Sequence, residues 1–247
     1  MEKIKVGAVS YLNTKPYIWG LTHSPIIDKI DLQIDYPARI AQGLIDGNYM
    51  IGLVPVAILP SLPSYHFITD YGIACDGEVA SVALFSQVPL KEIETIQLDY
   101  HSRTSVALLK ILLKNHWKIS PRIVPMVPGE SFEIHGKTAA LLIGDKALIQ
   151  LSATQFVYDL GTAWKELTGL PFVFAAWVSL QSLPDEFTAD FQNACAYGIS
   201  QIDNWKEEID FSSYSLSRYY KHNIHFLLDE DKKKGMRLFL QLLQKQS

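Results

Sequence analysis

The stretch IKVGAVSYLNTKP, residues 4–16, decides the fold at the start of this chain. Its first six residues are an apolar run of the kind that forms a buried strand. Four hydroxyl or amide side chains and a proline follow within the next seven residues. This change of composition predicts a strand that ends in a turn and leads into a helix. A strand followed by a helix is the repeating unit of α/β proteins.

The same alternation continues along the chain and predicts an α/β architecture with mostly parallel sheets. Strands are expected at residues 4–9, 32–36, 51–58, 95–99, 122–126, 139–143 and 172–178. Helices are expected at residues 16–21, 37–46, 104–116, 185–203 and 229–244. The chain contains no internal repeat and no Gly/Ser-rich linker, so two lobes joined by crossing strands are expected. A cleft between two such lobes is the default ligand site.

Composition excludes several classes of protein. The 247 residues suit one large domain or two small ones, and 48% apolar against 19% charged residues is typical of a globular protein. The net charge of -4 does not favour nucleic acid as a partner.

No stretch reaches the roughly 18 apolar residues of a membrane span, and the chain begins without a hydrophobic signal segment. We therefore expect no membrane association and a cytoplasmic location. Cys75 and Cys195 have no metal-ligand spacing, so no metal site is expected.

Two compatible interpretations exist for the turn SYLNTKP. In one, Asn13 or Thr14 caps a helix by accepting hydrogen bonds from free backbone amides, and Pro16 occupies the first turn. In the other, the helix start binds an anion, which Ser10, Tyr11 and Asn13 surround.

A second strand-to-helix turn lies in LDYHSRTSVALLKILL, residues 98–113. Ser102, Arg103, Thr104 and Ser105 stand where the helix is expected to begin. Free amides, hydroxyls and a guanidinium fork suit a carboxylate or a phosphate. The alternative is an ordinary Ser or Thr cap beside a solvated arginine. Together the two turns offer one anion-ready helix start in each expected lobe, which suits a small dianion.

Two further motifs carry polar residues on apolar strands. In LLIGDKAL, residues 141–148, Gly144 permits close backbone approach, and Asp145 can orient a donor in the cleft, cap a helix or act as a base. In VASVALFS, residues 79–86, Ser81 has no Gly-x-Ser-x-Gly elbow around it. A hydrogen bond from Ser81 to a ligand is therefore favoured over a covalent role.

The motifs VSYLNTKP, GLVPVAIL, VASVALFS, LDYHSRTSVALLKILL, LLIGDKAL and DLGTAWKELTGLPFVFAAW occur here in the order in which chorismate dehydratases carry similar motifs. The chain thus resembles that family, which acts in the futalosine route to menaquinone. The resemblance extends from Val6 to Trp177, and the C-terminal third adds little to it.

The resemblance implies a two-lobed fold like the type II periplasmic binding proteins, with a ligand cleft between the lobes. One lobe would comprise residues 1–86 and 176–247, and the other residues 87–175. It also implies a reaction, in which the dicarboxylate chorismate loses water to give 3-[(1-carboxyvinyl)oxy]benzoate. Aromatisation drives that elimination, so no redox or metal cofactor is expected.

Catalytic roles are expected for Asn13, Ser81 and Asp145. Substrate contacts are expected for Ser10, Tyr11, Ser102, Arg103, Thr104, Ser105 and Gly144. The matching motifs contain few bases, with Asp145 and His101 as the obvious candidates. We therefore expect the enolpyruvyl carboxylate of the substrate to take the ring proton, while Asn13 and Ser81 position it or the leaving hydroxyl.

Two other functions remain open at this point. One is a lyase like 1,4-dihydroxy-6-naphthoate synthase, which acts on a larger substrate in the same route. The other is a non-catalytic protein that binds small anions, because ligand capture is the commonest task of the implied fold. The sequence does not indicate an oligomeric state.

Overall fold

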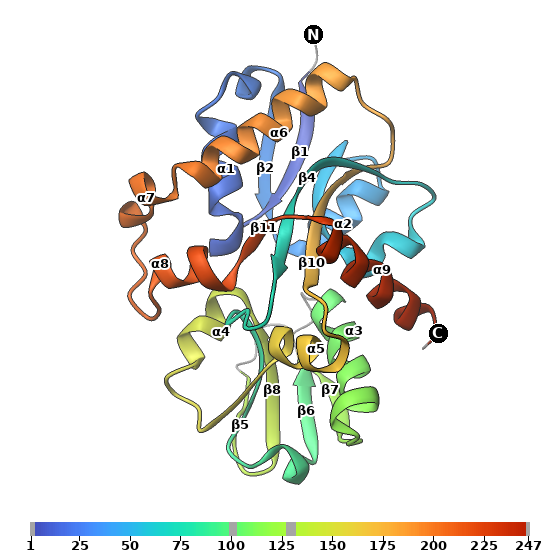
Figure 1. Ribbon diagram of the computed structural model, residues 1–247, viewed down its shortest axis with the longest axis vertical. Coiled ribbons are helices and arrows are strands. Elements are labelled where there is room, and N and C mark those ends of the chain that lie inside the picture. Colours follow the sequence, from blue (N-terminus) through green and yellow to red (C-terminus); the bar gives the residue numbers. More distant parts are fainter. Residues whose placement is uncertain (1–2, 99–102, 127–131, 246–247) are drawn as a thin grey trace.

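Two β-sheets, each flanked by helices, form two lobes stacked along the long axis of the molecule (Figure 1). The computed structural model describes residues 3–98, 103–126 and 132–245. We call the lobe that holds the six-stranded sheet the first lobe, and the lobe that holds the five-stranded sheet the second lobe.

The first lobe is built from both ends of the chain. Its strands are β1 (Ile4–Val9), β2 (Ile30–Asp35), β3 (Ile51–Pro55), β4 (His66–Cys75), β10 (Phe172–Ser179) and β11 (His225–Leu227). Its α-helices are α1 (Lys15–Thr22), α2 (Pro37–Ile45), α6 (Asp185–Ser200), α7 (Ile202–Trp205), α8 (Leu216–Arg218) and α9 (Glu230–Gln244). Short 3-10 helices are η1 (Leu12–Thr14), η2 (Pro25–Asp28), η3 (Val56–Ser61) and η6 (Lys206–Glu208), and η7 (Tyr219–Asn223) is a π-helical turn.

The second lobe comes from the middle of the chain. Its strands are β5 (Val82–Ser86), β6 (Thr95–Leu98), β7 (Arg122–Pro125), β8 (Thr138–Ile143) and β9 (Phe156–Asp159). Its helices are α3 (Arg103–Leu112), α4 (Gly144–Gln150) and α5 (Leu160–Thr168), with the 3-10 helix η4 (Leu90–Glu92) and the π-helical turn η5 (Leu113–Trp117).

Both sheets are mixed, so the expectation of mostly parallel sheets is wrong. The first sheet has the order β11-β4-β10-β3-β1-β2, and the second has the order β7-β6-β8-β5-β9. Strand β1 runs parallel to β2 and β3, but β10 runs antiparallel to β3 and β4. In the second sheet β5 likewise runs antiparallel to β8 and β9. The physical reason is that the chain has to leave the first lobe along β4 and return along β10, and such a pair must run in opposite directions.

Most expected elements are present with small shifts at their ends. The strand expected at residues 51–58 ends at Pro55, because the 3-10 helix η3 begins at Val56. Strands β4, β9 and β11 were not expected. In β4, whose sequence is HFITDYGIAC, polar residues interrupt the apolar pattern because the first half of the strand is partly exposed.

The lobes are connected by residues 76–81, between β4 and β5, and by residues 169–171, between α5 and β10. Helix α9 packs against β10 and η3 in the first lobe and also against α3 in the second. Sheet membership assigns β5 to the second lobe and all of β10 to the first. The expected lobe limits, at residues 86/87 and 175/176, stay a prediction.

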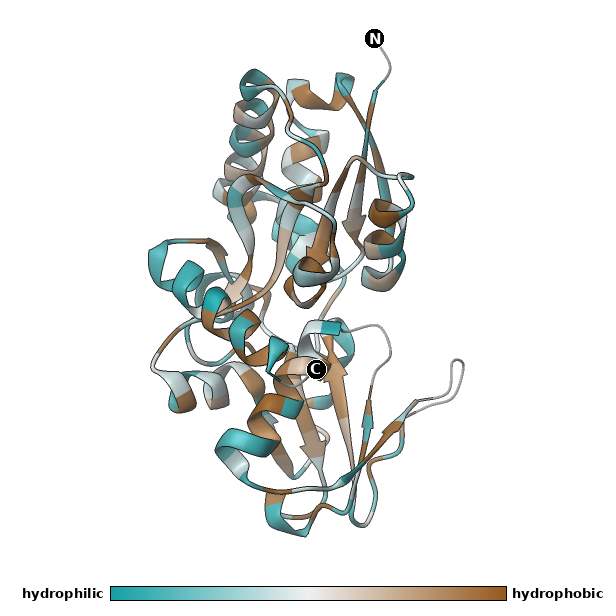
Figure 2. Cartoon of the chain, turned by 90° about the vertical axis from the view of Figure 1, so that its right-hand side faces the viewer, coloured by the Kyte–Doolittle hydropathy of each residue, from teal (hydrophilic) through white to brown (hydrophobic). Residues whose placement is uncertain are grey.

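One part of the core of the first lobe lies between its sheet and the helices α1 and α6, and another lies beneath α2 and α9. Trp177 of β10 is fully buried and makes edge contacts with Tyr17 and Phe191, at centroid distances of 5.8 and 5.1 Å. Hydropathy colouring shows the apolar residues gathered on the strands and on the inward faces of the helices (Figure 2). Helices α1 and α6 approach so closely that a Cβ on Gly20 or Gly198 would overlap the backbone of the facing helix.

We expect Gly198→Ala to destabilise the protein by about 3 kcal/mol, because the added methyl group meets the carbonyl of Pro16 and forces the helices apart. The matched control is Gly47→Ala, where a Cβ has open space but the backbone has φ +75°. Only the conformational cost of about 1 kcal/mol applies there. Urea unfolding of both variants measures the difference, and equal losses would contradict the close packing of α1 on α6.

Candidate functional site

A pocket lies between the lobes, where strands of both sheets end. Val9 and Pro55 are the last residues of β1 and β3, and Ile143 is the last residue of β8. The pocket therefore occupies the carboxyl ends of strands, the expected position in an open α/β fold. Its lining residues are Val9, Tyr11, Asn13, Thr14, Pro37, Leu53, Pro55, Ile73, Val79, Ser81, Val82, Thr104, Ser105, Ile143, Gly144, Phe174 and Ala175.

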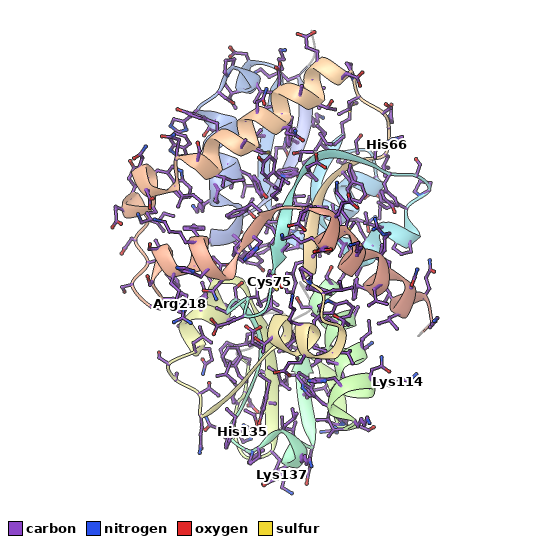
Figure 3. The ribbon with its side chains drawn as sticks, in the orientation of Figure 1. His66, Cys75, Lys114, His135, Lys137 and Arg218 are labelled. Atoms are coloured by element: carbon purple, nitrogen blue, oxygen red, sulfur yellow. The ribbon has the colours of Figure 1, made fainter. Side chains whose placement is uncertain are left out.

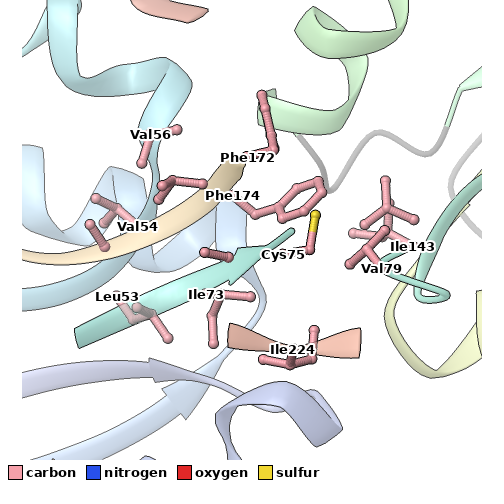
Figure 4. Packing of buried hydrophobic residues seen from close by; sticks show 14 of the residues in the cluster. Leu53, Val54, Val56, Ile73, Cys75, Val79, Ile143, Phe172, Phe174 and Ile224 are labelled. Carbon is pink, nitrogen blue, oxygen red and sulfur yellow. The ribbon is translucent and has the colours of Figure 1, made fainter. Parts of the chain in front are cut away.

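The walls of the pocket are largely apolar. Figure 4 shows Leu53, Ile73 and Phe174 from the first lobe and Val79 and Ile143 from the other side of the junction. Such walls suit a flat or cyclic carbon skeleton, and the few polar groups among them fix the orientation of the ligand.

The turn after β1 contributes Tyr11, Asn13 and Thr14 to the pocket. The expected capping by Asn13 or Thr14 is wrong, since neither side chain caps η1 or α1 in the described structure. Instead the η1 turn bonds its own backbone, and the Thr14 hydroxyl donates to Asn13 Oδ1 at 3.1 Å. Pro16 lies in the first turn of α1 as predicted. Ser10 is exposed and does not line the pocket, so its contact with a ligand stays a prediction.

Asp145 caps this turn from the opposite lobe. Its Oδ1 accepts a hydrogen bond from the backbone N–H of Leu12 at 3.0 Å, 133 positions away in the sequence. Burial raises the pKa of Asp145, while the Leu12 hydrogen bond and the charge of Lys15 lower it. Asp145 does not line the pocket. This hydrogen bond thus joins the lobes and holds the turn that carries Asn13.

Gly144 forms a tight part of the pocket wall. Its φ of +60° favours glycine, and a Cβ there would lie 3.0 Å from Cγ of the Tyr11 ring. Its N–H donates to the carbonyl oxygen of Ser81 at 2.8 Å. Gly144 therefore permits Tyr11 to pack against the second lobe while it also holds Ser81.

Ser81 follows a strained turn in the connection between β4 and β5. Ala80 has φ +60°, which is uncommon for a residue with a Cβ, and the N–H of Ser81 donates to Val79 O at 2.7 Å. Asp159 stabilises the turn by accepting from the N–H of Ala80 at 2.8 Å and from that of Val79. Strain of this kind persists where surrounding contacts enforce it, often at functional sites.

The start of α3 contributes Thr104 and Ser105, both buried, to the pocket. Thr104 Oγ1 also accepts from the N–H of Ala57 at 3.2 Å, a second hydrogen bond between the lobes. Arg103 is exposed and does not line the pocket, so its contact with a ligand stays a prediction. His101 and Ser102 lie outside the described residues.

The C-terminal segment supplies residues that sequence reasoning missed. The hydroxyl of Tyr219 donates to Ser81 Oγ, and that of Tyr220 donates to the carbonyl oxygen of Leu12, each at 2.9 Å. Arg218 pairs with Glu78 at 2.9 Å beside the connection between the lobes (Figure 3). No local sequence signal marks the tyrosines, because their partners lie 138 and 208 positions away. The sequence did indicate a structural role for Asp159, since an aspartate between a strand and the start of a helix is a typical N-cap.

The polar groups that line the pocket are hydroxyls and an amide. The described lining residues include no carboxylate, imidazole, amine or thiol. Across residues 3–98, 103–126 and 132–245, no three His, Cys, Asp or Glu side chains gather as the ligands of a metal ion would. This arrangement can bind and orient a ligand that has an apolar skeleton and a negatively charged group. It offers few groups that could take a proton from that ligand.

In the same three stretches, no helix is long and apolar enough to cross a membrane. The cytoplasmic location stays a prediction.

Fold and pocket together define a two-lobed α/β protein with a pocket between its lobes. Two solved structures share the fold, although sequence identity to each is low. One is a protein of Archaeoglobus fulgidus, with a TM-score of 0.74, 14% identity, and coverage of 99% of this chain and 97% of that one. The other is a Candida albicans protein described as having the generic periplasmic binding protein fold, with a TM-score of 0.59, 12% identity, and coverage of 99% and 91%.

The chain belongs to the menaquinone biosynthesis family, whose sequence model matches residues 4–245. A relative from Thermus thermophilus, named chorismate dehydratase, is 27% identical over 269 residues, which cover 98% of this chain and 96% of that protein. The periplasmic-binding-protein-like fold and the role in menaquinone biosynthesis that the sequence predicted are thus confirmed.

We expect the stability of the protein to fall as pH rises through the range in which Asp159 titrates. Burial raises the pKa of Asp159 from an ordinary value of 3.8 to about 6. The backbone hydrogen bonds that Asp159 accepts lower the pKa, but burial has the larger effect. Between these values the folded state binds the proton more tightly than the unfolded state, so the free energy of unfolding decreases with rising pH. At about 1.4 kcal/mol per pH unit, the contribution of Asp159 falls by about 2 kcal/mol between pH 4 and pH 7.

The comparison with Asp159→Asn isolates this effect, because asparagine does not titrate. Urea unfolding at pH 4, 5, 6 and 7 gives the difference in unfolding free energy between wild type and variant. That difference should decline steadily across the range. A constant or rising difference would show that folding does not raise the pKa of Asp159.

Proposed function

We propose that this protein removes water from chorismate to give 3-[(1-carboxyvinyl)oxy]benzoate, the reaction of a chorismate dehydratase. The observation that carries the proposal is the composition of the pocket, in which apolar walls surround hydroxyls and one amide at two helix starts. Chorismate matches this composition because it is a carbocycle with two carboxylates. Membership of the menaquinone biosynthesis family and the Thermus thermophilus relative support the same reaction.

The start of α3 is the proposed site for one carboxylate. Thr104 and Ser105 line the pocket there, at the positive end of the dipole of a ten-residue helix. If the ring carboxylate binds at this helix start, the enolpyruvyl carboxylate points toward Asn13 and Ser81 on the other side of the pocket.

The proposed elimination is substrate-assisted. The C–H bond at the ether carbon breaks, its electron pair forms the new ring double bond, and the enolpyruvyl carboxylate takes the proton. The neighbouring C–O bond breaks, and the hydroxyl leaves as water once it has gained one proton, which restores the carboxylate. The lack of bases among the described lining residues supports this route. Ser81 and Asn13 would hold the leaving hydroxyl and the carboxylate in line, and such positioning is worth several orders of magnitude in rate.

Asp145 is better suited to positioning than to proton abstraction. One of its oxygens is engaged by Leu12 N–H, and the residue does not line the pocket. We propose that its contribution is to hold the Leu12–Thr14 turn, and with it Asn13, against the substrate.

One assay separates this function from the two alternatives. Purified protein is incubated with chorismate, and the formation of an aromatic product is followed by absorbance and chromatography. A chorismate dehydratase forms the benzoate product. A naphthoate-synthase-like lyase ignores chorismate, and a non-catalytic binding protein binds chorismate but returns it unchanged, so either result would refute the proposal.

We expect Asn13→Ala to lower kcat by about 100-fold or more, since loss of one oriented donor at a reacting group has that magnitude. The fold should remain intact, because Asn13 caps no helix. Asn48→Ala, on an exposed loop, is the matched control and should retain full turnover. If Asn13→Ala unfolds the protein instead, the residue acts in stability and the catalytic proposal for it fails.

We expect Asp145→Asn to retain turnover within about tenfold, because an asparagine oxygen can still accept the Leu12 hydrogen bond. Asp145→Ala, which loses that acceptor, should raise KM. His101→Ala tests the other base suggested by the sequence. Substrate assistance would be refuted by complete loss of turnover with chorismate binding retained, in either Asp145→Asn or His101→Ala.

A further inference from the structure

Tyr219 lies at the centre of a hydrogen-bonded chain that joins the C-terminal segment to the pocket. The residue begins the π-helical turn η7 and is fully buried. Its hydroxyl donates to Ser81 Oγ at 2.9 Å, and the side chain of Asn13 also interacts with its oxygen and lowers the pKa of the phenol. Tyr219 does not itself line the pocket, whereas Ser81 and Asn13 both do.

The hydrogen bonds of this chain run in one direction. The Thr14 hydroxyl donates to Asn13 Oδ1, which leaves the amide NH2 of Asn13 as the donor to the Tyr219 oxygen. Tyr219 in turn donates to Ser81.

Ser81 is held at three other points besides its side chain. Its N–H donates to Val79 O, and its carbonyl accepts from Gly144 N–H. Asp159 holds the turn before it through the N–H groups of Val79 and Ala80. A serine hydroxyl has one hydrogen to donate, and its oxygen is already accepting from Tyr219. The hydrogen of Ser81 is therefore directed away from Tyr219, and the side chain borders the pocket.

Burial keeps Tyr219 in the form that can donate. Desolvation is the main cause that raises the pKa of its phenol well above the ordinary value of 10.0, and the hydrogen bonds with Ser81 and Asn13 lower it only in part. The raised pKa keeps the hydroxyl of Tyr219 protonated at neutral pH. It can thus orient Ser81 without giving up its proton.

We propose that Tyr219 is a positioning residue that fixes the hydroxyl of Ser81 as a hydrogen-bond donor to the hydroxyl that leaves the substrate. This inference rests on the proposed dehydratase function. It gives the C-terminal segment a task in the reaction: the turn η7, held to Glu78 by Asn223 and by the neighbouring Arg218, brings the phenol to Ser81.

The first test is Tyr219→Phe, which removes the hydroxyl and keeps the ring that fills the buried space. We expect kcat to fall by about tenfold or more, with KM changed by less than about threefold, because the contact acts on the leaving group and not on binding of the ground state. Tyr17→Phe is the matched control, since Tyr17 is also fully buried and its hydroxyl donates to Gly72 O, outside the pocket. The control should lose stability without losing turnover. Equal kcat for both variants would overturn the proposal.

The second test asks whether Tyr219 acts through Ser81. In a double-mutant cycle, Tyr219→Phe should lower kcat of the wild type but should have no further effect in a Ser81→Ala background. The same fold-loss in both backgrounds would show that Tyr219 acts independently of Ser81, which contradicts the proposal.

A third measurement does not depend on turnover. The side-chain NH2 signal of Asn13 in an ¹H–¹⁵N spectrum is identified by its loss in Asn13→Ala, and Tyr219→Phe should shift it while Tyr17→Phe should not. If the signal shifts but the wild type does not consume chorismate, the proposed function fails while the hydrogen-bonded chain stands. If the signal does not shift, the chain is absent and the role of Tyr219 fails, whatever the activity.

Discussion

The antiparallel pairing of β4 with β10 is the constraint on which the rest of the structure depends. These two strands carry the chain out of the first lobe and back into it, and they are neighbours in the middle of one sheet. Their pairing holds the two short connections, residues 76–81 and 169–171, side by side. Because of this arrangement, the carboxyl ends of β1, β3 and β8 converge on one pocket instead of facing solvent separately.

The pocket is assembled by hydrogen bonds between segments that are distant in the sequence. Asp145 reaches Leu12 across the lobes, and Thr104 reaches Ala57. Both bonds use a side chain of the second lobe to accept from a backbone N–H at the start of a 3-10 turn of the first. Each bond therefore satisfies a terminal amide and also sets the distance between the lobes. The helix starts that could bind an anion are in this way also the points at which the lobes meet.

The chemistry of the pocket is limited by the lack of basic side chains among its described lining residues. A side chain that takes a proton from carbon has to be a base in contact with the substrate, and the described lining residues provide hydroxyls and an amide instead. Such groups can align a reactive substrate and stabilise its leaving group. A fold that captures ligands is well suited to this kind of catalysis, because closing two lobes around a molecule already excludes water and fixes its orientation.

The sequence by itself determined the α/β class, the strands β1, β3 and β10, and the helix start after β1. Its motifs also revealed a family resemblance, from which Asn13 and Ser81 could be selected as candidate site residues. These features depend on local periodicity and on contiguous motifs. Tertiary structure alone decided that both sheets are mixed, that Asp145 caps the turn at Leu12 and not its own helix, and that Tyr219 lies against Ser81. The physical reason is separation along the chain: Asp145 and Leu12 lie 133 positions apart, and Tyr219 and Ser81 lie 138 apart, so no local pattern records their contact.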